Sequence, residues 1–69
     1  MIYFFERSGN FIRCEVHHVG DHYELLIVGS DGMESVERFA DADGVHARQI
    51  ALERGLVNGG WTGPHGRSI

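Results

Sequence analysis

Two runs of strand-favouring residues fill the stretch from Phe11 to Val28, and Gly20-Asp21 separates them. A Gly-Asp dipeptide between such runs is typical of a tight hairpin, because the turn needs positive φ. A two-residue loop places Val16 opposite Leu25 and Cys14 opposite Ile27, whereas a three-residue loop would send the apolar sets to opposite faces. The pattern therefore predicts a hairpin with one apolar face, made by Ile12, Cys14, Val16, Tyr23, Leu25 and Ile27.

The opposite face of this hairpin is not cleanly polar. It carries charged and apolar residues together: Phe11, Arg13, Glu15, His17, Val19, His22, Glu24, Leu26 and Val28. An antiparallel sheet with one side in water shows polar residues at such positions. Leu26 beside Val28 departs from that expectation, so this second face is a candidate interface.

A first strand is predicted over Ile2–Arg7, followed by a second turn signal at Gly9-Asn10. A two-residue loop there pairs Tyr3 with Val16 and Phe5 with Cys14, which adds both aromatic residues to the apolar face. Glu6 then lies opposite Arg13 on the other face, as a cross-strand ion pair. Ile2 and Phe4 join Leu26 and Val28 on the second face.

A fourth strand is predicted over Met33–Phe39, after the hairpin signal Asp31-Gly32. A two-residue loop places Val36 opposite Ile27 on the apolar face. Phe39 then has the wrong parity for that face, so we expect a bulge or the end of the strand near Glu37-Arg38.

The period changes from Ala42 to about Val57, where the spacing predicts a helix that begins at Asp41 or Asp43 and ends at Asn58-Gly59-Gly60. Its apolar arc contains Ala42, Val45, Ile50, Leu52, Leu56 and Val57. Gln49, Glu53 and His46 add a polar seam to this arc. These side chains lean to the edge or hydrogen-bond across the sheet, or else they form a polar pocket between helix and sheet. Tyr23 and His18 are candidates to share such a pocket.

The predicted fold class is α+β, with a four-stranded antiparallel meander and one C-terminal helix packed on one face. Residues 1–60 form the domain, and residues 61–69 form a tail without periodicity. Trp61 is the exception in this tail, because so large an apolar group favours packing back onto the domain.

Composition restricts the function. The chain has 69 residues and a net charge of −4, and its six basic side chains are all Arg. A chain this short buries only about 60% of its unfolded surface, so oligomerisation would help to stabilise it. The acidic balance disfavours non-specific nucleic-acid binding. The apolar start, Met1 to Phe5, is too short for a signal peptide or a membrane span, so we expect a cytoplasmic protein.

Candidate chemistry is sparse. Cys14 alternates with Ile12 and Val16, so we expect a buried and unreactive thiol. His17, His22 and Glu24 share one face and are the candidate metal ligands, but a solvated polar surface is the favoured explanation, so no metal site is predicted. The chain contains no nucleophile-elbow, phosphate-loop or dinucleotide-binding motif. We therefore predict a non-enzymatic protein without a cofactor.

The predicted order of elements, ββββα over residues 2 to 57, resembles the PUR-alpha and Whirly/PC4-like single-strand-binding domains at the level of topology. The resemblance implies a curved sheet that binds single-stranded nucleic acid and units that associate in pairs. Its site residues would be Phe4, Phe11, Arg13 and His17 on the second face.

Two function classes follow from the sequence. The first is a homodimeric protein-interaction or structural domain with an unidentified protein partner, whose interface is the second sheet face. Its residues are Ile2, Phe4, Phe11, Leu26 and Val28. The second class is a single-strand nucleic-acid binder.

Overall fold

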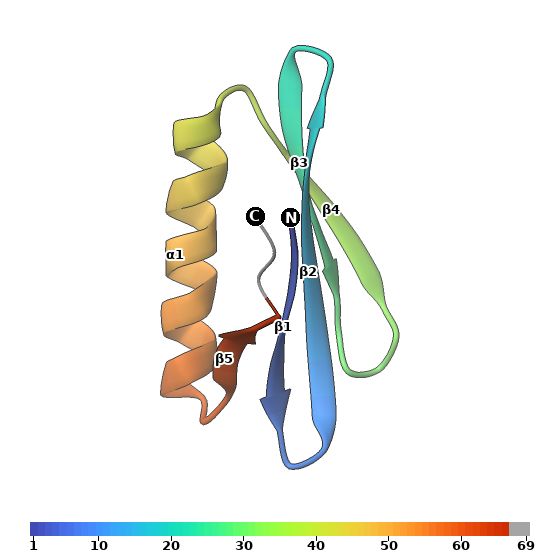
Figure 1. The fold of residues 1–69 in the computed structure, drawn as a ribbon, viewed down its shortest axis with the longest axis vertical. Coiled ribbons are helices and arrows are strands. Elements are labelled where there is room, and N and C mark those ends of the chain that lie inside the picture. Colours follow the sequence, from blue (N-terminus) through green and yellow to red (C-terminus); the bar gives the residue numbers. More distant parts are fainter. Residues whose placement is uncertain (67–69) are drawn as a thin grey trace.

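The protein is an α+β domain with a five-stranded antiparallel sheet and one helix. The structure, a computed structural model, describes residues 1–66 (Figure 1). The elements in chain order are β1 (Ile2–Arg7), β2 (Asn10–Val19), β3 (His22–Val28), β4 (Glu34–Phe39), α1 (Ala42–Asn58) and β5 (Thr62–His65). The order of strands in the sheet is β4-β3-β2-β1-β5, so β1 to β4 form the predicted meander and β5 extends it beyond β1.

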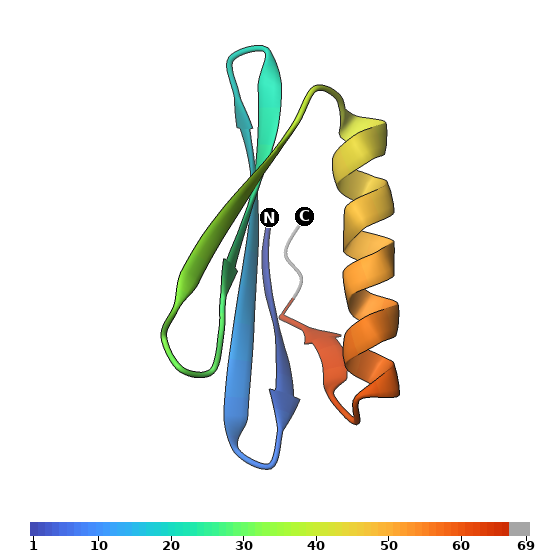
Figure 2. The same cartoon turned by 180° about the vertical axis from the view of Figure 1, so that it is seen from behind.

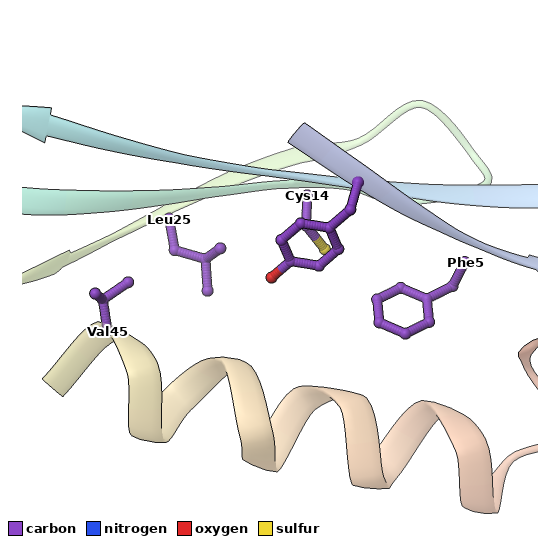
Figure 3. Close-up of a cluster of buried hydrophobic side chains, with 5 residues drawn as sticks. Phe5, Cys14, Leu25 and Val45 are labelled. Carbon is purple, nitrogen blue, oxygen red and sulfur yellow. The ribbon is translucent and has the colours of Figure 1, made fainter. Parts of the chain in front are cut away.

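Helix α1 lies along one side of the sheet, and within residues 1–66 no helix lies on the other side (Figures 1 and 2). We call these the core face and the outer face. The buried residues are Tyr3, Phe5, Cys14, Leu25 and Val45. Figure 3 shows these side chains between the strands and α1. The helix therefore buries the side chains of only one of the two faces.

The β2–β3 hairpin has the predicted register. Val19 faces His22 and Cys14 faces Ile27, which leaves Gly20 and Asp21 as the loop. Gly20 has a φ of +60°, the left-handed conformation that a tight turn requires. Cys14 has no exposed surface, as expected from its alternation with apolar neighbours.

The predicted β1–β2 register was wrong by two residues. Tyr3 faces Cys14, and Glu6 faces Phe11 instead of Arg13. The cause is the turn, because the loop consists of Ser8 and Gly9, which both have positive φ (+52° and +81°) as in a type I′ turn. A shift of two residues preserves the parity of the strand, so the predicted faces of β1 are retained.

The predicted β3–β4 register was wrong by one residue, and this shift exchanges the two faces of β4. The connection contains five residues, Gly29–Met33, and is held by the Met33 N–H, which donates to Asp31 Oδ1 at 3.0 Å. Val36 therefore faces Leu26 on the outer face instead of Ile27 on the core face. Phe39 faces Tyr23 and packs against the core in a continuous register, so the suspected bulge is not needed.

Helix α1 begins at the predicted cap. Asp41 accepts a hydrogen bond from the Gly44 N–H at 2.8 Å, and Gly60 beyond the helix has a φ of +88°. The predicted apolar arc was too broad, because Ile50 and Val57 are 38% and 49% exposed. The inner side instead consists of Val45, Leu52 and Leu56 together with the polar residue Gln49.

The predicted tail contains a fifth strand. Phe4 pairs with His65 and Glu6 pairs with Thr62, so β5 joins the free edge of β1. A Cβ at Gly63, whose φ is +140°, would lie 2.7 Å from a carbon of the Phe5 ring, so the close approach of β5 requires glycine. Residues 67–69 of the tail lie outside the described residues.

Trp61 packs against the core, as predicted. The Arg7 guanidinium lies 4.9 Å from the centre of its ring, in a cation–π contact. Arg7 also donates to the Gly59 carbonyl at 2.7 Å, so it fastens the segment after the helix to β1. Within residues 1–66, the helix is too short and polar to cross a membrane.

Candidate protein-interaction surface

The outer face carries two apolar clusters with a row of charged residues between them. The aromatic cluster consists of Ile2, Phe4 and Phe11, and the aliphatic cluster of Leu26, Val28 and Val36. The β2 ridge between them consists of Arg13, Glu15 and His17. All five predicted interface residues therefore lie on one face, and Val36 adds a sixth that the sequence reasoning assigned to the core.

The aromatic cluster is open to solvent although its rings touch. Phe4 lies between two other rings, with centroid separations of 5.7 Å to Phe11 and 5.3 Å to His65. Ile2, Phe4 and Phe11 nevertheless remain 49%, 36% and 54% exposed. These edge-on and tilted contacts hold the rings in place and leave a ridged apolar surface.

The aliphatic cluster lies where β3 and β4 pair. Leu26 faces Val36 directly, and Val28 faces Glu34 on one side and Arg13 on the other. Val36 is 58% exposed because it lies on the edge strand. The sequence pattern missed Val36 because the five-residue loop before β4 contains a strong two-residue turn signal.

The β2 ridge is neutralised within the chain. One carboxylate oxygen of Glu15 lies 3.0 Å from Arg13 Nε, and the other lies 3.0 Å from His17 Nε2. The Glu15 side chain is only 17% exposed, whereas those of Arg13 and His17 are about half exposed. Arg13 and His17, the two basic residues of the predicted nucleic-acid face, are therefore already engaged by a carboxylate.

The candidate metal ligands are not brought together. His17 contacts Glu15, whereas His22 Nε2 lies 3.4 Å from Glu24. The Arg38 guanidinium lies 3.2 Å from the same His22 nitrogen, where its positive charge opposes a bound cation. Among residues 1–66, no group of three or more His, Cys, Asp or Glu side chains is arranged to hold a metal ion.

The polar residues of α1 that face the sheet hydrogen-bond to side chains of the strands. Gln49 donates to the Tyr3 hydroxyl at 2.9 Å, and Arg48 forms two hydrogen bonds with Glu37 at 2.8 and 3.2 Å. The polar seam thus reaches across to the sheet through Gln49, while His46 is exposed. Burial raises the pKa of the Cys14 thiol to about 11, which keeps it protonated and a poor nucleophile.

A shallow depression of about 480 Å³ lies on α1. Its walls are side chains of this one helix, from Ile50 to Asn58. Ligand sites normally enclose most of their ligand with walls from several elements. The outer sheet face is therefore the stronger candidate site.

Comparisons of the chain with protein-family models, curated proteins and solved structures found no match. The topological resemblance to PUR-alpha and Whirly/PC4-like domains stays a prediction, and the chain's own surfaces carry the functional argument.

Proposed function

We propose that the protein is a small interaction domain that forms a homodimer through its outer sheet face, in the cytoplasm and without a cofactor. The observation that carries the proposal is the set of six apolar residues in the aromatic and aliphatic clusters of the outer face, four of which are 36% to 58% exposed. Burying one such side chain fully is worth roughly 1.5–3 kcal/mol. Apolar patches of this kind mark association sites on soluble proteins.

A second copy of the chain fits this face because the face is complementary to itself. The two-fold axis of this dimer lies in the plane of the contact and runs across the strands. It passes between two rows of cross-strand neighbours, one through Arg13 and one through Glu15. Rotation about this axis places Arg13 over the partner's Glu15 and Val28 over the partner's Leu26. Phe4 meets the partner's Ile2 in the same way. Four of the six clustered apolar residues and both charges then find matching groups in an isologous contact, while Val36 lies over the partner's Glu34 and Phe11 over the partner's His17.

The size of the molecule agrees with this arrangement. It measures 38 × 21 × 20 Å, and its long strands run roughly along the longest of these dimensions (Figure 1). One broad side therefore covers an area close to the roughly 800 Å² that each partner contributes to a standard stable interface.

Sedimentation equilibrium at micromolar concentration tests the proposal. We expect the wild type to be a dimer and Leu26→Glu to be a monomer, because the new carboxylate would be buried at the contact beside Glu15. Val57→Glu is the matched control, since it changes an exposed apolar residue on α1 and should leave the dimer intact. A wild-type monomer, or equal dimerisation of both variants, would contradict the proposal.

A second candidate function, single-strand nucleic-acid binding, is favoured by the aromatic cluster. The row of Phe11, Phe4 and His65 offers ring surfaces for bases. The engagement of Arg13 and His17 by Glu15 and the net charge of −4 oppose it. Fluorescence titration with labelled single-stranded oligonucleotides at low and moderate salt separates the candidates. Tight, salt-sensitive binding that Phe4→Ala abolishes would support the second one.

A further inference from the structure

The free edge of β4 is the one long open edge of the sheet among the described residues. β4 has six residues without proline, and Glu34, Ser35, Val36 and Arg38 are all exposed. The strand leans away from α1 along much of its length (Figures 1 and 2). The opposite edge is the four-residue strand β5, where Pro64 lacks the N–H that a further strand would need.

Glu34 and Arg38, the charges of β4 on the outer face, lack opposite partners among residues 1–66. Glu34 makes no ion pair among residues 1–66, and the Arg38 guanidinium contacts the His22 ring at 3.2 Å but no carboxylate. The two residues cannot pair with each other, because positions four apart along a strand lie about 13 Å from one another. Glu34, Val36 and Arg38 alternate on the outer face, so acid, aliphatic and base follow in order along the edge.

We propose that β4 pairs antiparallel with β4 of a second copy, about a two-fold axis through Val36. In this register Val36 faces the partner's Val36. Glu34 faces the partner's Arg38, and the symmetry repeats this ion pair on the other side of the axis. The result is a continuous sheet across two copies, with their helices on the same side.

Symmetry and charge select this register from its neighbours. A two-fold axis perpendicular to the sheet places the outer faces of both copies on the same side. This condition holds only if one residue of β4 faces the same residue of the partner's β4, so the axis passes at a residue position and not between two positions. An axis at Glu37 would place Glu37 opposite the partner's Glu37, which is a repulsive cross-strand pair. An axis at Ser35 would place Glu34 opposite the partner's Val36 and leave both charges without a partner.

Exposure at the start of β4 agrees with the register centred on Val36. Met33 is the most exposed large apolar residue described, at 71%. It directly precedes the strand and would lie opposite the partner's Phe39. The pairing therefore covers Val36 and Met33, two exposed apolar side chains of this edge.

This edge contact is distinct from the proposed contact through the outer face and does not depend on it. A single pair of short strands buries less surface than a whole sheet face, so the edge contact should be the weaker one. It should add a further association step at high micromolar concentration, beyond whatever the outer face forms at low concentration.

Charge exchange tests the edge contact. Arg38→Glu places two acids on each edge and Glu34→Arg two bases, so each variant alone meets like charges across the axis. An equimolar mixture of the two restores both ion pairs in a mixed assembly. We expect the mixture to associate at least tenfold more tightly than either variant alone in sedimentation velocity. The double variant E34R/R38E should behave like the wild type.

The design separates the two proposals. The mass of each single variant alone reports on the outer face, as a dimer if that contact forms and as a monomer if it does not. The increase in mass on mixing reports on the β4 edge in either case. A mixture that sediments like its separate components, with far-ultraviolet circular dichroism showing folded variants, would overturn the edge pairing.

Discussion

The two faces of the sheet are built from alternate residues of the same strands, but one face is buried and the other is exposed. On β1, Tyr3 and Phe5 are 2% and 1% exposed, whereas Ile2 and Phe4, which alternate with them, are 49% and 36% exposed. The side chains are comparable in size and hydrophobicity. The difference is α1, which lies against only one of the two faces.

The comparison shows that burial in this domain is decided by parity and not by residue type. One helix supplies Val45, Leu52 and Leu56 to the core face, and no second layer exists among the described residues for the outer face. An apolar residue on the other parity therefore lies on the face that α1 does not cover. Domains normally bury every apolar face against another layer, so the outer face is the part of the fold that a monomer leaves incomplete.

The largest expected effect separates two adjacent leucines. Leu25→Ala should destabilise the domain by about 2–5 kcal/mol, because Leu25 is fully buried and the change leaves a cavity. Leu26→Ala should cost much less when measured below the dimerisation concentration, since Leu26 lies on the outer face. Urea denaturation of both variants measures the difference. Equal losses would mean that the outer face is covered within the chain.

Cys14 gives the next largest effect, at alkaline pH. Burial raises its pKa from an ordinary value of 9.0 to about 11, against smaller opposing effects of Arg48 and the Tyr3 hydrogen bond. Between these pH values the unfolded chain loses the thiol proton while the folded chain keeps it, so stability should fall as pH rises. The loss should approach about 2 kcal/mol. Cys14→Ala, compared by urea denaturation at each pH, should lose this component of the pH dependence.

Thiol labelling tests the same contrast of faces directly. Native Cys14 should react slowly until denaturant is added. Arg13→Cys in a Cys14→Ala background moves the thiol by one residue to the outer face, where the native side chain is 54% exposed. This variant should react rapidly when it is measured below the dimerisation concentration, where the outer face is uncovered. Rapid labelling of native Cys14 would contradict the assignment of faces.

A smaller effect is expected at the turn that sets this parity. Gly20 has a φ of +60° and no atom within 4 Å of a built Cβ, so a side chain there meets strain and no collision. Gly20→Val should therefore cost about 1–2 kcal/mol. Gly55→Ala is the opposite control, because Gly55 lies in open space within α1 and alanine should stabilise the helix by up to about 1 kcal/mol. Thermal melting of both variants gives the comparison.

The smallest effect concerns the β2 ridge. Glu15→Gln removes the carboxylate that holds Arg13 and His17, and exposed ion pairs of this kind contribute about 0–1 kcal/mol. The stability of the monomer should change little. Dimerisation through the outer face should weaken more, because Glu15 is also the proposed partner of Arg13 across the interface. Sedimentation equilibrium and urea denaturation of this variant separate the two effects.

Turn geometry explains which parts of the fold could be predicted. Gly20-Asp21 permits one short loop, so the β2–β3 register and the burial of Cys14 were correct. Ser8-Gly9 replaced Gly9-Asn10 as the first loop, but the even shift left every side chain on its predicted face. Before β4, Asp31-Gly32 is part of a five-residue loop, and the odd shift exchanged Val36 and Phe39.

The candidate surface was predictable to the same extent. Ile2, Phe4, Phe11, Leu26 and Val28 share the predicted face because their parities survived. Val36 was missed with the β4 register, and His65 was missed because β5 consists of residues with little strand preference. Thr62 and its neighbours form a strand because β1 offers an unpaired edge beside them, a tertiary effect that local sequence does not show.

The pairing of β5 with β1 also determines when the domain can be completed during synthesis. Thr62 donates to the Glu6 carbonyl across 56 residues of sequence. During synthesis β1 leaves the ribosome well before β5, so the Phe5 ring can pack against Gly63 only after β5 has been made. A chain that has been synthesised only as far as α1 therefore leaves the side of Phe5 that Gly63 contacts uncovered. The last short strand closes the core that the first strand begins.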